Sequence, residues 1–575
     1  MKALFLIPAR GGSKGLPGKN LALVGGIPLV GRAVRVARQV AAGLPGSRVV
    51  CSTDDPAIAE AAQEWGAEVP FVRPDDLATD DARSLDVVRH ALRALDEEFE
   101  VVVLLQPTSP LTEPKDILGS LELFRMTGEP VVSVCRAEHP GEWHRRMDLA
   151  GRLSAVLPIS SAERRQKVAP TYRPNGAVYV ASPAQVRGEG FWTAETRGFI
   201  MPTERSVDVD TAADLEMARA LLAMRPVVPV EIAGRKIGFG YPCFIIAEAG
   251  VNHNGSLDMA LKLVDAAADA GADAVKFQTF VAERLVTVAA AKAAYQVRNT
   301  GSRGSQLEML KELELSPEAH TAIFARCRQR GILFISSPFE EESSDLLDAL
   351  GVTAFKVPSG EMTNLPFLRH LARKGRPLIV STGMATLAEV DDTVDTLRGE
   401  GCRKIVLLHC VSQYPANPRE SNLRAMATMR EAFAAPVGFS DHAVGSTVAL
   451  AAVALGACVL EKHLTLDRAL PGPDHKASLE PDELTDLVRS VRSTEQALGD
   501  GRKEPTSCEM ETARAARKSL VAARVIPVGA ALTADMVEIR RPGTGLPPKR
   551  MDSLLGRRAQ GEIPGGTLLD EEMFD

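Results

Sequence analysis

The sequence lacks any apolar run of the roughly 18–20 residues that a membrane-spanning helix requires. Its first apolar stretch, Ala3–Ile7, is too short for the core of a signal peptide and runs directly into a polar, glycine-rich segment. We therefore expect neither a membrane anchor nor a secretion signal. The stretch instead predicts the first strand of a folded domain.

Paired cysteine motifs are also missing. The eight cysteines are scattered, with no Cys-x-x-Cys spacing, in a chain of 575 residues. A chain of this size does not need disulfides to be stable. We expect reduced, mostly buried thiols and a cytoplasmic location.

An excess of positive charge is absent as well. The chain has 67 Lys and Arg residues against 74 Asp and Glu residues, which gives a formal net charge of -7. This is the wrong sign for a protein whose main partner is nucleic acid, so we expect no nucleic acid partner. Any anion that binds must be held by a local basic site.

The composition indicates several ordinary globular domains. At roughly 100–200 residues per domain, the length predicts about three to five folding units. Hydrophobic residues make up 45% and charged residues 25%, both average values for globular proteins. Two prolines within Met224–Pro229 end a helical stretch, so we place the first boundary there. The predicted domains span residues 1–225, 230–505 and 515–575.

The first of these regions alternates short β-branched runs with amphipathic helical stretches. Such alternation predicts a mostly parallel, doubly wound α/β sheet. The expected strands are 3–7, 48–52, 101–105, 131–134 and 177–180, and two of the expected helices are 29–42 and 86–95.

The second region contains eight apolar runs, each ending in polar residues and followed by helix-like sequence. Eight strand–helix units in about 275 residues are typical of a (β/α)₈ barrel, whose active residues lie at the C-terminal ends of the strands. The runs are 243–248, 274–278, 333–337, 354–359, 378–382, 405–409, 437–442 and 458–463. The polar residues at their ends are Glu248, Lys276, Gln278, Lys356, Ser359, Glu361, His409, His442 and His463.

Residues 515–575 predict a small β-rich module, with strands at 518–522 and 537–539. A weak internal repeat relates Ile526-Pro527-Val528-Gly529 to Ile563-Pro564-Gly565-Gly566. A module this small needs a neighbour to be stable, either the barrel of its own chain or that of a second subunit.

A glycine-rich basic loop, 10–20, follows the first predicted strand. Its glycines let backbone amides approach a phosphate closely, and Arg10, Lys14 and Lys19 add positive charge. We interpret the loop as a triphosphate-binding site, although it departs from the Walker A pattern.

An acidic motif, Asp208-Val209-Asp210, lies in a strand-like context where the two-residue period places both carboxylates on one face. Neighbouring carboxylates suit Mg²⁺, which usually takes one or two of them together with substrate phosphates. Taken alone, such a motif is more often a solvated edge. The Mg²⁺ interpretation therefore depends on the phosphate loop in the same domain.

In the barrel, His442 and His463 end the last two predicted strands, which are neighbours, so their imidazoles can share one divalent ion. Two protein ligands leave positions for water and substrate, which describes a Lewis-acid site. Lys276 and Lys356 are costly to bury unless they meet an anion, such as a small phosphorylated acid. Glu248 lies among apolar neighbours, where burial should raise its pKa and suit it to proton transfer.

Residues 1–222 resemble the CMP-N-acylneuraminate synthetases through four motifs in the same order: PARGGSKGLPGKN, LLQPTSPL, RPNGAVY and SVDVDT. The resemblance implies that CMP passes from CTP to a nonulosonic acid with release of pyrophosphate. It also implies Mg²⁺ on Asp208 and Asp210, catalytic roles for Arg10 and Lys19, and sugar contacts from Asn175 and Tyr179. The nucleotide contacts that it implies are Arg10, Gly11, Gly12, Ser13, Lys14, Asn20, Arg73 and Gln106.

Residues 230–575 resemble the sialic acid synthase family through IAEAGVNHNG, VKFQT, ISSPF, KVPSGE, STGM, GFSDH, LEKH and PGPDHKAS, and the tail resembles the antifreeze-like domain of those synthases. The resemblance implies condensation of phosphoenolpyruvate with an N-acylated mannosamine-type aldose, with Mn²⁺ or Mg²⁺ on His442 and His463. It further implies a homodimer in which Arg541 reaches the barrel of a second subunit. The remaining implied roles are proton transfer by Glu248, binding of the phosphate and carboxylate by Lys276, Lys356, Ser359 and Ser381, and sugar contacts from Gln278, Glu361, Tyr414 and Asp474.

These observations together predict a bifunctional enzyme whose barrel makes a sialic-type acid and whose N-terminal domain couples that acid to CMP. The alternative is the same pair of reactions on the legionaminic acid pathway, whose aldose is 2,4-diacetamido-2,4,6-trideoxymannose. The motif 361–364 is compatible with this alternative, as is Glu142, which stands near a position where some synthetases have a lysine. A sugar-nucleotide sensor with inactive sites would require lost catalytic residues, but every candidate position is chemically competent.

Overall fold

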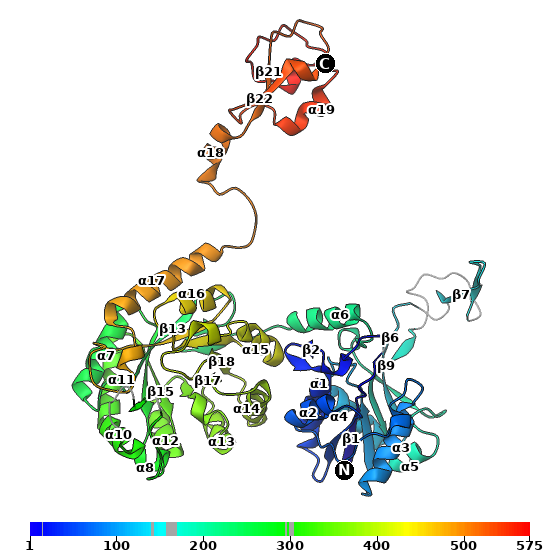
Figure 1. The fold of residues 1–575 in the computed structure, drawn as a ribbon, viewed down its shortest axis with the longest axis vertical. Coiled ribbons are helices and arrows are strands. Elements are labelled where there is room, and N and C mark those ends of the chain that lie inside the picture. Colours follow the sequence, from blue (N-terminus) through cyan, green and yellow to red (C-terminus); the bar gives the residue numbers. More distant parts are fainter. Residues whose placement is uncertain (14, 140–142, 157–169, 294–295, 298–303) are drawn as a thin grey trace. The chain divides into compact units, whose positions relative to one another are not determined.

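The computed structural model describes residues 1–13, 15–139, 143–156, 170–293, 296–297 and 304–575 (Figure 1). Contacts divide it into two units, Met1–Ala497 and Leu498–Asp575. Within the described residues, no helix has both the length and the hydropathy needed to cross a membrane. All eight cysteines are free, and seven of them are buried.

The N-terminal domain is built on a six-stranded sheet in the order β10-β6-β9-β5-β1-β4. β9 runs antiparallel to β5 and β6, and the other pairs are parallel. The mostly parallel sheet and its five expected strands are therefore confirmed. The strands are β1 (Ala3–Pro8), β4 (Arg48–Ser52), β5 (Val101–Leu105), β6 (Val131–Arg136), β9 (Tyr172–Ala181) and β10 (Arg197–Ile200).

Helices cover both faces of this sheet, and the interior strand β1 is apolar on both sides. Phe5 and Ile7 of β1 pack in one core cluster with residues of α1 and α4, whereas Leu4 and Leu6 pack in another with residues of α3. Successive side chains of a strand point to opposite faces, so β1 is buried on both. The helices of this domain are α1 (Leu29–Ala41), α2 (Pro56–Glu64), α3 (Ser84–Leu95), α4 (Pro114–Thr127), α5 (Pro183–Arg187) and α6 (Ala212–Ala223), and the short hairpins are β2 (Leu23–Val24) with β3 (Ile27–Pro28) and β7 (Arg145–Met147) with β8 (Leu153–Ala155).

The central domain is an eight-stranded parallel sheet in the order β15-β14-β13-β20-β19-β18-β17-β16. The two end strands, β15 and β16, lie against each other, so the sheet is a nearly closed barrel. All eight predicted strands are present. They are β13 (Phe244–Gly250), β14 (Ala274–Thr279), β15 (Leu333–Pro338), β16 (Phe355–Val357), β17 (Leu378–Ser381), β18 (Ile405–Cys410), β19 (Val437–Asp441) and β20 (Val459–His463).

One end of the barrel is closed by a hairpin of β11 (Val230–Ile232) and β12 (Arg235–Ile237). Its apolar side chains pack with residues from the first half of the barrel strands, such as Ile246 and Ile379. The amino-terminal end is thereby filled, which leaves the carboxyl end for a site. The barrel helices are α7 (Leu257–Asp269), α8 (Ala282–Leu285), α10 (Gln306–Leu313), α11 (Pro317–Arg330), α12 (Glu341–Leu350), α13 (Leu365–Arg373), α14 (Leu387–Gly399), α15 (Ala425–Phe433), α16 (Thr447–Ala454) and α17 (Pro481–Leu498).

The C-terminal unit contains α18 (Glu509–Ala516), the antiparallel strands β21 (Ser519–Ala522) and β22 (Val537–Arg540), and α19 (Met551–Leu554). Its internal repeat is visible in the backbone, because Ile526 and Ile563 pair with each other, each amide donating to the other carbonyl at 2.9 Å. Leu532 and Leu569, at equivalent places in the repeat, share the core of this unit. The two halves of the repeat therefore pack against one another around one apolar centre.

Candidate active sites

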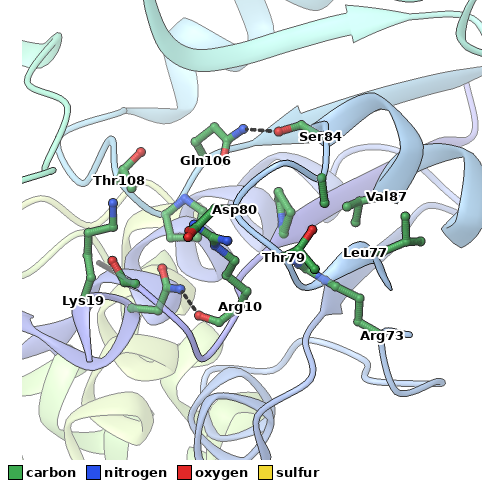
Figure 2. A pocket seen from close by; sticks show the side chains of 15 residues that line it. Arg10, Lys19, Arg73, Leu77, Thr79, Asp80, Ser84, Val87, Gln106 and Thr108 are labelled. Carbon is green, nitrogen blue, oxygen red and sulfur yellow. Dashed lines mark hydrogen bonds and ion pairs between the residues drawn. The ribbon is translucent and has the colours of Figure 1, made fainter. Parts of the chain in front are cut away.

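A cavity of about 190 Å³ lies at the carboxyl end of β1, where the glycine-rich loop begins (Figure 2). The side-chain amide of Asn20 donates to the carbonyl of Arg10 at 2.9 Å and holds the loop in a curve. Gln106 donates to the Ser84 hydroxyl at 3.2 Å on another side of the cavity. The residues with predicted roles that line this cavity are Arg10, Ser13, Lys19, Asn20, Arg73 and Gln106. Lys14 lies outside the described residues.

Gly11 and Gly12, two of the four glycines of this loop, differ in what surrounds them. The amide of Gly11 donates to Asp54 at 3.0 Å, and a Cβ at this position would lie 2.8 Å from a carboxylate oxygen of Asp55. A Cβ on Gly12 would meet no atom within 4 Å. Gly11 is therefore needed for close packing of the loop, whereas Gly12 leaves open the space beside it.

Positive charge is concentrated at this cavity despite the negative net charge of the chain. Arg10 pairs with Asp80, and Lys19 Nζ lies 2.8 Å from Asp210 Oδ1. Arg73 is buried and donates to the Ser52 hydroxyl at 3.2 Å, and burial lowers the pKa of its guanidinium. Cations gathered from separate segments of the domain form the local basic site that an anion requires.

The prediction that Asp208 and Asp210 lie in a strand is wrong, because the segment between β10 and α6 joins no sheet. Val209 is nevertheless buried and donates its amide to the Thr108 carbonyl at 2.8 Å, so the carboxylates still flank one inward residue. Partial burial and the nearby Asp210 raise the pKa of Asp208. A divalent cation relieves repulsion between carboxylates, so the pair fits Mg²⁺.

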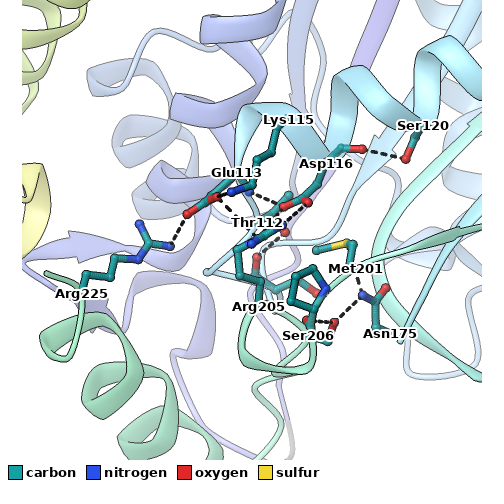
Figure 3. A network of polar contacts seen from close by, with 12 residues as sticks. Thr112, Glu113, Lys115, Asp116, Ser120, Asn175, Met201, Arg205, Ser206 and Arg225 are labelled. Atoms are coloured by element: carbon teal, nitrogen blue, oxygen red, sulfur yellow. Dashed lines mark hydrogen bonds and ion pairs between the residues drawn. The ribbon is translucent and has the colours of Figure 1, made fainter. Parts of the chain in front are cut away.

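A polar network holds the segment that leads into this pair (Figure 3). Arg205 binds Asp116 with both arms of its guanidinium, at 2.6 and 3.0 Å. Asn175 donates to the Ser206 hydroxyl at 2.9 Å and accepts from the Ser133 hydroxyl at 2.6 Å. A bidentate ion pair such as Arg205–Asp116 fixes the relative orientation of its two side chains. The network therefore holds in place the segment that leads to Asp208 and Asp210.

The two residues predicted to contact the sugar do not line the cavity at the carboxyl end of β1. Asn175 is only 1% exposed and belongs to the network in Figure 3. Tyr179 of β9 packs against Phe191 and Trp192, and burial together with nearby Asp208 raises its pKa. Tyr179 thus lies near the acidic pair, and the sugar contacts of both residues stay predictions.

A larger cavity, of about 530 Å³, opens among the carboxyl ends of the barrel strands. Its size is typical of ligand pockets. The residues with predicted roles that line it are Glu248, Lys276, Gln278, Lys356, Ser359, Glu361, Ser381, Tyr414, His442, His463 and Asp474. Arg541 lies in the C-terminal unit, so its role at the barrel stays a prediction.

His409 is the strand-end residue that the structure does not bring to this cavity. Its Nε2 lies 2.8 Å from the carbonyl oxygen of Ser421, and the next residue, Cys410, lines the cavity instead. Adjacent residues of a strand face opposite sides, so only one of the two can point inward. His409 therefore points away from the cavity although it lies near a strand end.

Two lysines and two glutamates form the charged centre of the cavity, and all four are buried. Lys276 Nζ lies 2.7 Å from Glu248 Oε2 and 3.7 Å from Glu461 Oε2, and Lys356 Nζ lies 3.6 Å from Glu461 Oε1. Burial raises the pKa of Glu248 to about 7 although Lys276 opposes this shift. Burial acts likewise on Glu461, but two neighbouring lysines outweigh it and lower its pKa. Glu461 is therefore the permanent counter-charge and Glu248 the carboxyl group that titrates near neutrality.

The two imidazoles lie side by side, with ring centroids 5.5 Å apart. The Nδ1 of His442 donates to the Val411 carbonyl at 2.6 Å, which leaves Nε2 as the nitrogen able to bind a cation. No described residue hydrogen-bonds the buried Nδ1 of His463. Burial lowers the pKa of both rings and keeps them neutral.

This pair fits a divalent ion that retains open positions. In the described part of the chain, no group of three or more His, Cys, Asp or Glu side chains could hold a metal. Two imidazoles alone leave room for water and substrate oxygens, as in a Lewis-acid site and unlike a structural zinc.

Sequence reasoning missed Glu461 and Ser440, which line the same cavity. The Ser440 hydroxyl donates to Glu461 at 2.8 Å and orients its carboxylate. A signal was available, because each residue precedes a cavity-facing histidine by two positions, His463 at the end of β20 and His442 directly after β19. The two-residue period therefore places Ser440 with His442 and Glu461 with His463.

Comparison with known proteins identifies the families that the three regions of the chain match. Models of the Cytidylyltransferase family, the NeuB family and the SAF domain match residues 4–149, 263–503 and 517–575. The chain is 47% identical over 336 residues to N,N'-diacetyllegionaminic acid synthase of Legionella pneumophila, covering 58% of this chain and 94% of that protein. It is 38% identical over 357 residues to human N-acetylneuraminate-9-phosphate synthase, covering 60% and 98%. A solved N-acetylneuraminic acid synthetase from Leptospira borgpetersenii is 34% identical, with a TM-score of 0.45, over 50% of this chain and 96% of that one.

Proposed function

The chain belongs to the NeuB family, with a cytidylyltransferase domain before the barrel and an SAF domain after it, and on this basis we propose that it is a bifunctional enzyme of nonulosonic acid biosynthesis. The barrel would condense phosphoenolpyruvate with an N-acyl aldose and, with addition of one water molecule at C2 of the enolpyruvate, release phosphate. The N-terminal domain would then transfer CMP from CTP to the product and release pyrophosphate. The observation that carries this proposal is the presence of a lysine-rich, imidazole-bearing barrel cavity and a glycine-loop cavity in one chain.

In the barrel, Lys276 and Lys356 supply charge for the phosphate and carboxylate of phosphoenolpyruvate, and Ser381, which accepts from Lys356 at 2.7 Å, lies beside them. Glu248, at 2.7 Å from Lys276, is placed to take or return a proton as C3 of the enolpyruvate bonds to the aldehyde carbon. A Mn²⁺ or Mg²⁺ ion on His442 and His463 would supply polarisation of the aldehyde oxygen.

Two further contacts complete the proposed synthase site. Gln278, Glu361, Tyr414 and Asp474 line the cavity and would bind the hydroxyl and amide groups of the aldose. Arg541 of the SAF domain would enter from a second subunit, which makes the proposed enzyme a homodimer.

In the N-terminal domain, Arg10 and Lys19 would neutralise the triphosphate while Asn20 and Gln106 orient the nucleotide. The anomeric hydroxyl of the acid would attack the α-phosphate, and pyrophosphate would leave. Mg²⁺ held by Asp208 and Asp210 would supply further charge neutralisation at the phosphates. A weakly nucleophilic hydroxyl depends on such neutralisation, because positioning and charge are most of what the protein contributes.

A second candidate is the legionaminic acid pathway, in which both reactions act on 2,4-diacetamido-2,4,6-trideoxymannose and its product. Sequence identity favours it, at 47% to the legionaminic acid synthase against 38% to the neuraminate-9-phosphate synthase.

The direct test incubates the full chain with phosphoenolpyruvate, CTP and each candidate aldose. We expect phosphate and pyrophosphate in equal amounts, together with a CMP-sugar whose mass identifies the aldose. Release of either anion without formation of a CMP-sugar would contradict the proposed coupling of the two reactions.

The raised pKa of Glu248 predicts a pH dependence that is confined to the synthase. Below about pH 7 the carboxyl group is protonated and cannot accept a proton, whereas above it the group is ionised. We therefore expect kcat/KM for phosphate release to fall as the pH decreases through about 7, and pyrophosphate release from added sialic acid and CTP to lack this step. The residual activity of Glu248→Gln should not show the step, and a step that persists in this variant would contradict the assignment.

A further inference from the structure

A buried ion pair lies next to the two imidazoles in the chain and takes no part in the mechanism described above. Lys462 Nζ lies 2.7 Å from Asp441 Oδ2, and each side chain is only 1% exposed. The two residues are paired in register at the ends of the neighbouring strands β20 and β19. Each of them directly precedes one of the imidazole residues, His463 and His442.

This ion pair faces away from the barrel cavity. Neither Lys462 nor Asp441 lines the cavity, whereas the residues on either side of each of them do. Successive side chains of an extended chain point to opposite faces, so the pair lies on the outer face of the sheet, where α15 and α16 contact β19. A pair in this place does not touch substrate, so its effect on the reaction must pass through the residues beside it.

Lys462 holds the chain on both sides of His442. Its ammonium group donates to the Asp441 carboxylate, one residue before His442, and to the Ala443 carbonyl, one residue after it. The other oxygen of the same carboxylate accepts from the Ala443 amide at 2.9 Å. The backbone around His442 is thus enclosed by hydrogen bonds that originate from the residue directly before His463.

The imidazole of His463 depends on its backbone for its position. No described residue hydrogen-bonds its buried Nδ1, whereas the Nδ1 of His442 has such a bond. The carbonyl of His463 accepts from the Leu479 amide at 2.8 Å, and the contact between Lys462 and Asp441 holds the strand one residue earlier. Loss of the ion pair therefore affects how the two rings are aligned with each other.

From this geometry we infer that Lys462 and Asp441 are positioning residues, which hold His442 and His463 at the separation at which both imidazoles can bind one divalent cation. The ring centroids lie 5.5 Å apart. The inference rests on the proposed function, because the cation belongs to the proposed synthase reaction.

Stability of the fold does not account for this ion pair. Transfer of an ammonium and a carboxylate group out of water costs free energy, which their mutual attraction offsets only when the geometry is good. Apolar side chains of similar volume often stabilise a fold equally well or better. Charged hydrogen bonds add directionality, which packing contacts lack, and here they reach the backbone on both sides of His442.

The experiment measures Mn²⁺ binding to the metal-free full chain from the electron paramagnetic resonance signal of the free ion. The chain has two proposed cation sites, so the barrel site is identified as the one that is lost in His442→Ala. The test variant combines Lys462→Met with Asp441→Asn, which removes both charges and leaves no uncompensated buried charge. We therefore expect its thermal unfolding midpoint to stay close to that of the wild type.

We expect the Kd of the barrel site for Mn²⁺ to rise about 10- to 100-fold in this double variant, as is typical when residues that orient metal ligands are replaced. The Mn²⁺ concentration that gives half-maximal phosphate release should rise by a similar factor. A Kd depends on the midpoint of the titration and not on the amount of folded protein, so partial unfolding cannot imitate this result.

A second variant and a control complete the design. Asp441→Asn alone removes the ion pair but keeps an acceptor for the Ala443 amide, and we expect the same direction of change in Kd. The matched control is Thr279→Val at the end of β14, which keeps the shape of the side chain but removes buried contacts with Ser336 and His320. Thr279 does not line the cavity, so its loss should lower the unfolding midpoint and leave the Kd unchanged.

An unchanged Kd in the folded double variant, or in Asp441→Asn, would overturn this inference and leave the proposed function standing. An equal rise of the Kd in Thr279→Val would also overturn it, because loss of any buried polar contact would then be sufficient. If His442→Ala loses no Mn²⁺ site, the proposed metal site of the synthase fails, and this inference fails with it.

Discussion

A His442→Ala variant should lose about 1,000-fold or more of its phosphate release from phosphoenolpyruvate, while its CTP-dependent activation of added sialic acid is unchanged. His442 is fixed by the Val411 carbonyl and lies beside His463, so its removal leaves a cation with a single imidazole. Polarisation by a metal contributes several kcal/mol, and each 1.4 kcal/mol corresponds to a tenfold change in rate. Separate assays of phosphate and pyrophosphate on the same preparation give both numbers.

The matched control for this variant is His409→Ala. His409 ends the neighbouring strand but directs its ring to the Ser421 carbonyl and not into the cavity. It should therefore retain phosphate release. Loss of both activities in a folded His442→Ala protein would contradict two separable sites.

An Asp210→Ala variant should show the opposite pattern, with pyrophosphate release reduced by about 1,000-fold and phosphate release unchanged. Asp210 lies 2.8 Å from Lys19, which lines the cavity at the end of β1, and with Asp208 it forms the carboxylate pair proposed to hold Mg²⁺. Loss of one of two carboxylate ligands removes several kcal/mol of charge stabilisation at the transferred phosphate. The Mg²⁺ concentration that gives half-maximal activity should rise as well, which a titration of pyrophosphate release against Mg²⁺ measures.

Glu216→Ala is the control for this second variant. Glu216 is an exposed carboxylate on the following helix whose ion pair is with Arg219. Its removal changes the net charge of the domain by the same amount but touches no residue of the cavity. Unchanged pyrophosphate release in Asp210→Ala would remove the Mg²⁺ assignment, and an equal loss in Glu216→Ala would show that only overall charge matters.

The local pattern of apolar residues was sufficient to predict the strands of the barrel and of the N-terminal sheet. The eight barrel strands appear where apolar runs predict them, and the five expected strands of the N-terminal sheet are all present. Buried parallel strands are nearly continuous apolar runs, so each one is visible in a short window of sequence. The repeat in the C-terminal unit was visible as the similarity of two short motifs.

Side-chain direction was less predictable. His409 and Cys410 are neighbours, and which of them faces the cavity depends on the register of β18 against β17 and β19. The Asp208–Asp210 segment keeps its alternation without being a strand, because one amide bonds to Thr108 outside any ladder. A shift of one residue moves a side chain to the other face, and local sequence does not specify that shift.

The sequence by itself determined the order of the domains, the barrel, the glycine-rich loop and the residue types available at each strand end, because these depend on period and composition over short windows. Only the tertiary structure decided that Glu461 balances both lysines and that Arg205 clamps Asp116 across 89 positions of the chain. Such pairings join segments that are distant in the chain, and their energies arise from burial and distance, which exist only after the strands have come together.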